Sequence, residues 1–160
     1  MSTNETVCAR FLIVCKPLSS WHHANAREHG CVVDFVREVD WLLSESSYRD
    51  VSKVRLVLDN LNSHVVASLY KAFSAVKARG LARRLEIHYT PKHGSWLNIA
   101  EISISILSRQ CVDRRISGLG LLNREVGAWE KEYNSKRNVV NWQFTTEDAR
   151  IKLHKLYPVF

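Results

Sequence analysis

The sequence lacks the cysteine spacing of a zinc knuckle or a redox protein. Its four cysteines include no C-x-x-C pair, and we expect them to be reduced, mostly buried thiols. Long hydrophobic runs are lacking as well: residues 1–6 are polar, and the apolar run at residues 11–14 is far too short to span a bilayer. These absences predict a cytoplasmic protein without a membrane partner.

Internal repeats, low-complexity runs and obvious linkers are also missing, so the 160 residues fit one domain. The chain is 46% hydrophobic and has five tryptophans, which is enough apolar surface for a folded core. The 23 Lys and Arg exceed the 16 Asp and Glu, and this excess favours a polyanionic partner such as nucleic acid. The alternative, on charge alone, is a basic soluble protein without such a partner.

Hydrophobic periodicity predicts alternating strands and helices. The expected strands are residues 7–15, 21–28, 53–58 and 85–89, of which the first two form a hairpin. The expected helices are residues 32–43, a segment capped by Ser63 that ends or breaks near Gly80, and residues 98–112, 119–133 and 146–156. This order predicts an α/β fold with a mixed sheet, a hairpin first and parallel crossovers after it.

Residues 98–112 are ambiguous in period. Residues 102–106 alternate as a strand does, whereas Ile99, Ile102 and Ile106 share one helical face. The length of the segment exceeds that of a typical strand, and Ser95 lies in a plausible capping region. We therefore predict a helix.

Asp59 directly follows the predicted strand 53–58, at the strand end where open α/β sheets bind their ligands. Asn60, Asn62 and His64 crowd the same end. The alternative is that Asp59 and Asn60 simply form a turn, because both residue types favour turns.

A second polar segment spans residues 90–101, where Glu101 falls in the first turn of the predicted helix. If that helix packs beside the central strand, Glu101 can face Asp59, and two carboxylates from separate elements suit Mg²⁺. The alternative is that Glu101 only complements the positive helix N-terminus.

Three motifs carry a family resemblance: V-L-D-N-L-N-S-H at 57–64, T-P-K-H-G-S-W-L-N-I-A-E at 90–101 and N-W-Q-F-T-T-E-D-A-R at 141–150. Together they resemble the DDE-type transposases of bacterial insertion sequences, within the mariner superfamily, over nearly the whole chain. The resemblance implies a ribonuclease-H-like mixed sheet flanked by helices. It also implies two Mg²⁺ or Mn²⁺ ions that support DNA cleavage and strand transfer.

In this resemblance Asp59 matches the second acidic metal ligand of the family and Glu101 the third. Transposon ends and target DNA would be the partners, together with a second copy of the chain or a full-length transposase. The side chains expected near the metals or the DNA are Asn60, Asn62, His64, His93, Ser95, Trp96 and Asn98. For Trp96, a role in core packing is an equal alternative.

The sequence departs from the family pattern before residue 7. The first catalytic Asp, its strand and the helix-turn-helix domain are not matched there, and Glu5 is the only acid in that stretch. We therefore expect residues 1–160 to be a partial catalytic domain with little activity alone. The alternatives are a non-catalytic remnant that binds DNA or pairs with intact transposase, and an unrelated protein in which Asp59 and Glu101 are not neighbours.

Two basic clusters are weaker candidates for DNA contact, one around Gly80 and one at the end of the helix that carries Glu101. They comprise Lys77, Arg79, Arg83, Arg84, Arg109, Arg114 and Arg115. The alternative is that these cations are solvated helix ends, a position that suits positive charge.

A nicking assay on duplex DNA tests the expected lack of activity. We expect negligible divalent-ion-dependent cleavage by this chain, because two metal ions need more negative charge than two carboxylates supply. Robust cleavage that is abolished by Asp59→Asn would contradict this prediction. If the chain inhibits transposition by an intact relative and has no nuclease activity of its own, the remnant alternative is favoured.

Overall fold

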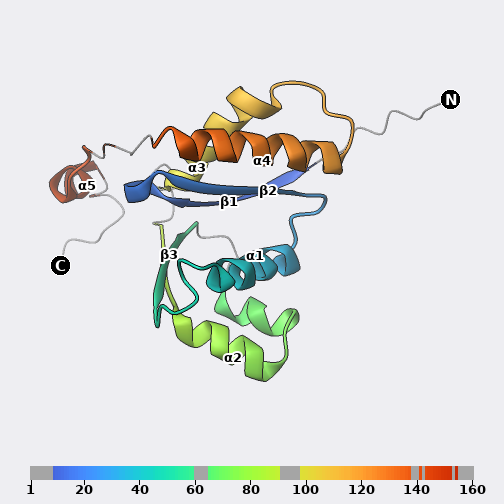
Figure 1. Ribbon diagram of the computed structural model, residues 1–160. Coiled ribbons are helices and arrows are strands. Elements are labelled where there is room, and N and C mark those ends of the chain that lie inside the picture. Colours follow the sequence, from blue (N-terminus) through green and yellow to red (C-terminus); the bar gives the residue numbers. More distant parts are fainter. Residues whose placement is uncertain are drawn as a thin grey trace.

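The structure is a computed structural model that describes residues 9–59, 65–90, 98–137, 141, 143–152 and 154. Strands and helices alternate along these residues, as predicted (Figure 1). The strands are β1 (Arg10–Lys16), β2 (Trp21–Arg27), β3 (Val54–Leu58) and β4 (Leu85–Tyr89). The helices are α1 (Val32–Ser44), α2 (Ala75–Arg84), α3 (Ile99–Leu107), α4 (Leu119–Ser135) and α5 (Thr146–Lys152), with 3₁₀ turns at Pro17–Ser19 and Val66–Lys71 and a π-helix at Ser108–Val112.

β1 and β2 form the predicted antiparallel hairpin, in register from Arg10↔Arg27 to Lys16↔Trp21. Alternate residues of β2 are buried, because one face of the hairpin packs against α3 and α4. The small side chains of Ala24 and Ala26 lie on that face and allow α4 to approach closely. Alanine is uncommon in strands, and the packing of α4 explains why β2 has it at these two positions.

β3 and β4 form a parallel pair, in register from Val54↔Leu85 to Leu58↔Tyr89. One face of this pair is buried: Val54 and Leu85 are at most 8% exposed. The other face carries exposed side chains, among them Val57, which is 57% exposed. Parallel sheets are usually covered on both faces, so this pair is unusually open.

The predicted single mixed sheet is not found in the part of the chain that the structure describes. There the strands form two separate two-stranded sheets, β1–β2 and β3–β4. α4 lies along one side of the hairpin and α1 along the other (Figure 1). None of the helices in the described ranges is long and apolar enough to cross a membrane.

Two hydrophobic cores hold these elements together. The first core joins α1, β3, the 3₁₀ turn at Val66–Lys71, α2 and β4, and its buried members are Val36, Val39, Leu43, Val54, Leu69, Ala78, Leu81 and Leu85. The second core joins β2, α3, the π-helix and α4, and its buried members are Ala24, Ala26, Leu107, Cys111, Leu122, Val126 and Trp129. Each fully buried large side chain stabilises its core by roughly 1.5–3 kcal/mol.

The prediction of one helix between Ser63 and Gly80 is wrong over the described residues. A 3₁₀ turn at Val66–Lys71 is followed by a break, and α2 then begins after Ser74, whose Oγ accepts a hydrogen bond from the amide of Lys77. In a single helix Val76, seven residues after the buried Leu69, would lie on the same face as Leu69, but Val76 is 85% exposed. Gly80 lies inside α2 rather than at its end, and Ser63 is outside the described residues.

The predicted helix at residues 98–112 is confirmed as α3 and the π-helix that continues it. Asn98 caps α3, and its Oδ1 accepts a hydrogen bond from the amide of Ala100 at 3.1 Å; the expected cap, Ser95, lies outside the described residues. Cys15, Cys31 and Cys111 are free thiols, as expected, but Cys31 is exposed because it lies at the N-cap of α1.

Two glycine substitutions test the backbone with opposite expected signs. Gly30 has φ +55°, and a Cβ there would lie 2.6 Å from Cδ of Arg10, so Gly30→Ala should destabilise the fold by about 1–3 kcal/mol. Gly80 lies in α2 with no atom within 4 Å of an added Cβ, so Gly80→Ala should stabilise it by about 0.5–1 kcal/mol. Urea denaturation of both variants checks this, and equal effects would contradict it.

Candidate functional site

Asp59 lies at the carboxyl end of the parallel pair. The amide of Thr90 donates a hydrogen bond to the carbonyl of Leu58 at 2.9 Å, one step beyond the paired strands. Asp59 follows this last hydrogen bond and is half-buried. The predicted placement of this carboxylate at a strand end is therefore confirmed, and this is the end of the strands where α/β proteins bind ligands.

Glu101 lies in the first turn of α3, the helix that follows β4. Its amide donates a hydrogen bond to the carbonyl of Asn98 at 3.0 Å, and its side chain is exposed. Ser103 and Leu107 face the opposite way and are buried, the first against β2 and the second in the second core. α3 is therefore held by one face and presents Glu101 on the other, in a position that also complements the helix dipole.

Asp59, Asn98 and Glu101 are the members of the predicted acidic site that the structure describes. The other predicted members, Asn60, Asn62, His64, His93, Ser95 and Trp96, lie outside the described residues. Among the residues it does describe, no group of three or more His, Cys, Asp and Glu side chains is arranged to hold a metal ion. Carboxylates are the ligand type that Mg²⁺ and Mn²⁺ prefer, so the donor chemistry of Asp59 and Glu101 fits these ions, and their pairing stays a prediction.

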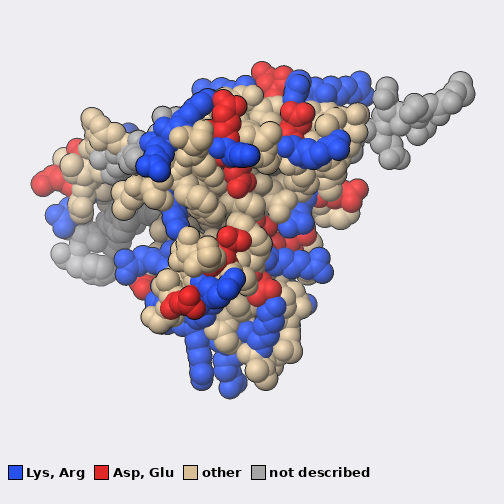
Figure 2. Space-filling view, viewed as in Figure 1, with Lys and Arg blue, Asp and Glu red and all other residues tan. Residues whose placement is uncertain are grey.

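Most of the predicted DNA-contacting cations are exposed. Arg79 and Arg83 project from α2, and Lys77 pairs with Asp40 across a 2.6 Å contact. Arg114 pairs with Glu125, and Arg109, whose Nε donates to a backbone carbonyl, and Arg115 are exposed near the end of α3. Exposed pairs of this kind contribute little to stability and exchange readily. Lys and Arg side chains project from the end of the molecule where α2 lies (Figure 2).

Arg84 differs from the other cations because its half-buried guanidinium bonds the backbone of another element. It donates to the carbonyls of Leu43, Tyr48, Arg49 and Val51, which belong to α1 and the segment after it. These bonds occupy most of its donors. Arg84 thus ties the last turn of α2 to the connection between α1 and β3, a role that its sequence context did not indicate and that weighs against a phosphate contact.

A charged cluster around His23 was also missed by the sequence analysis. The ring of His23, on β2, lies between Glu38 on α1 and Glu130 on α4: Nε2 is 2.9 Å from Oε1 of Glu38 and Nδ1 is 3.1 Å from Oε2 of Glu130. The first contact is an ion pair without the alignment of a good hydrogen bond. Burial opposes protonation, but the two carboxylates outweigh it and raise the pKa of His23 to about 9.

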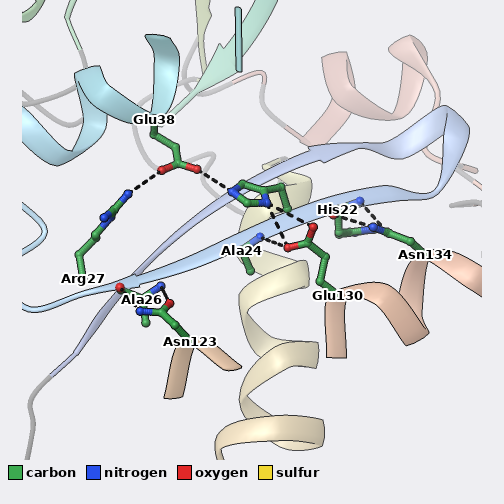
Figure 3. Close-up of polar contacts among 9 residues, drawn as sticks. His22, Ala24, Ala26, Arg27, Glu38, Asn123, Glu130 and Asn134 are labelled. Carbon is green, nitrogen blue, oxygen red and sulfur yellow. Dashed lines mark hydrogen bonds and ion pairs between the residues drawn. The ribbon is translucent and has the colours of Figure 1, made fainter. Parts of the chain in front are cut away.

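α4 covers the outer edge of β2 with side chains (Figure 3). The side-chain amide of Asn123 accepts a hydrogen bond from the N–H of Ala26 and donates one to its carbonyl. The side-chain amide of Asn134 pairs with His22 in the same way. Between them, Glu130 accepts a hydrogen bond from the amide of Ala24 at 3.1 Å. Backbone groups of a strand edge that would otherwise invite another strand are satisfied in this way.

His22 connects β2 to the helix that carries Glu101. Its Nε2 lies 3.0 Å from Oγ of Ser103, and that hydroxyl donates to the carbonyl of Ile99. Because the hydroxyl hydrogen is used, we assign the shared hydrogen to Nε2 of a neutral imidazole. Burial lowers the pKa of His22, which agrees with the neutral form, and a structural role follows.

Two arginine variants separate structure from DNA contact. Arg84→Gln should lower the free energy of unfolding by about 1–3 kcal/mol, because four carbonyls, two of them in part-buried contacts, lose a charged donor. Arg83→Gln, one residue earlier on an exposed position of α2, should change it by less than about 0.5 kcal/mol. Denaturant titration gives both values, and a salt-dependent loss of DNA affinity confined to Arg84→Gln would show that the internal role is not the main one.

Comparison with known protein families identifies the family of this chain. The family model described as DDE superfamily endonuclease matches residues 22–121. A search of curated proteins found no match, and neither did a search of solved structures. The matched residues are more than half of the chain and include both Asp59 and Glu101. The chain therefore belongs to the DDE superfamily endonuclease family.

Proposed function

We propose that this chain is the catalytic domain of a DDE-type transposase of the mariner superfamily, from a bacterial insertion sequence. Asp59 and Glu101 would supply two of the ligands of the divalent metal ions that such enzymes use for phosphodiester cleavage and strand transfer in DNA. The observation that carries the proposal is the position of Asp59 directly after the last hydrogen bond of the parallel β3–β4 pair. The match of the sequence to the family model also supports the proposal.

The chain path supports the pairing of the two carboxylates. β3 and β4 run parallel, so both leave the ladder at the same edge. β3 leads directly to Asp59, and β4 leads through Thr90 and residues 91–97 to α3, whose first turn carries Glu101. Both acids thus follow strands that end at one edge, which is where a shared metal site would form.

The residues of the chain would divide the work of catalysis. Asp59 and Glu101 would bind and orient the ions, and the exposed arginines of α2 would hold DNA phosphates. Bound Mg²⁺ or Mn²⁺ would activate a water or a DNA 3′-hydroxyl for in-line attack and stabilise the leaving oxygen. The net charge of +7 favours approach of the polyanion.

Paramagnetic Mn²⁺ tests the site independently of DNA cleavage. In amide NMR spectra, Mn²⁺ should broaden the signals of Leu58, Thr90 and Ile102, because these residues flank the two carboxylates in sequence or in the ladder. Asp59→Asn and Glu101→Gln should each weaken Mn²⁺ binding by about tenfold or more, since each removes a direct ligand.

Glu147→Gln is the matched control, because Glu147 is an exposed acid in the first turn of α5, as Glu101 is in α3. This variant should bind Mn²⁺ as the parent chain does. Broadening centred on α5, or unchanged Mn²⁺ affinity in both Asp59→Asn and Glu101→Gln, would refute the proposed site.

A further inference from the structure

We propose that His23 is a positioning residue for the metal site: by holding α1 and α4 together, it sets the distance between Asp59 and Glu101. This inference rests on the proposed function, because the metal site is part of that proposal. His23 itself touches neither carboxylate of the site; it acts through the elements that carry them.

The two carboxylates belong to different cores. Asp59 follows β3, which is anchored in the first core through Val54. Glu101 lies on α3, which is anchored in the second core through Leu107. A shift of one core against the other therefore changes the distance between the carboxylates, and metal binding tolerates little error in that distance.

His23 lies between elements of the two cores. Glu38 is on α1, next to Val39 of the first core, and Glu130 is on α4, next to Trp129 of the second core. In Figure 3 the labelled side chains of Glu38 and Glu130 point toward one another from opposite sides. Both ring nitrogens face carboxylates, which is the pattern of a doubly protonated imidazolium.

The surroundings of His23 restrict its movement. Its ring stacks on the indole of Trp41, from α1, with 3.8 Å between ring centroids. The side chain of Glu38 is only 6% exposed and also lies 3.4 Å from Nη2 of Arg27 on β2. The charged groups that face His23 are thus Glu38 from α1 and Glu130 from α4, with Arg27 beyond Glu38 on the strand of His23.

Short connections lead from His23 to the proposed ligands. The neighbouring residue, His22, contacts Ser103 on α3, two residues after Glu101. On the other side, α1 packs in the same core as β3, the strand that ends at Asp59. A displacement of the His23 side chain would therefore move Glu101 through α3 and Asp59 through α1 and β3.

The charge on His23 gives the proposal a pH signature. Its pKa, about 9 in the folded protein, exceeds the ordinary value of 6.5. Because the folded pKa is raised, the contribution of the bridge to stability is fully present below pH 6.5, and the bridge is lost as pH rises through about 9.

Distance measurement by double electron–electron resonance tests the positioning directly. Spin-labelled amino acids replace Val57 and Ser105, which are both exposed. Val57 lies two residues before Asp59, and Ser105 lies about one helical turn after Glu101. At about pH 7, which is below the pKa of His23, His23→Gln should broaden or shift the distribution of distances between the labels. His23→Arg should keep it narrow, because arginine also pairs with carboxylates and stacks on tryptophan.

The wild-type chain gives a second measurement that needs no substitution at His23. Its label distribution should broaden as pH rises through about 9, and that of His23→Arg should not. Lys136→Gln is the matched control, because Lys136 also pairs with a glutamate, Glu132, but at the exposed end of α4 and beside neither labelled position. It should leave the distribution unchanged. Mn²⁺ affinity should fall by about tenfold or more in His23→Gln and recover in His23→Arg.

An unchanged distribution in His23→Gln would overturn the positioning role, and so would a distribution that broadens while Mn²⁺ affinity is unaffected. A failure of His23→Arg to restore the distribution would overturn its electrostatic basis. Failure of the proposed function is recognised separately, since Asp59→Asn would then leave Mn²⁺ binding unchanged whatever the label distances are.

Discussion

Side chains of α4 act as the neighbour that β2 would otherwise need. Two asparagines and a glutamate, Asn123, Asn134 and Glu130, pair with the outer backbone groups of the strand. This pairing fixes where α4 lies, and with it the second core and the face on which α3 packs. The hairpin can then be narrow, because its outer edge is satisfied by a helix and not by a third strand.

Charge buried beside the hairpin has a different role from the cores. Glu38 is 5% exposed, and a buried carboxylate is tolerated only when cations surround it. His23 and Arg27 supply those cations from the same face of β2. Such a cluster contributes less to net stability than apolar packing does, but it accepts only one arrangement of its partners, so it specifies how α1 meets the hairpin.

Local patterns predicted the elements whose signals lie within a few residues. The hairpin, α1, β3, β4 and α4 follow from periodicity and turn residues, and Asp59 was placed correctly because a strand end is a local feature. The prediction for the segment before α2 was wrong, because its apolar spacing fits one helix. Only the tertiary structure reveals that Val76 faces solvent. The His23 cluster could not be predicted, since Glu130 is 107 positions away in sequence.

The open face of the β3–β4 pair has an evolutionary consequence. Arg55 and His88 lie on that face and bond Glu86, outside both cores. Substitutions there leave the buried face, with Val54 and Leu85, untouched. The electrostatic field along the strand that leads to Asp59 can therefore diverge between related chains at little cost to folding.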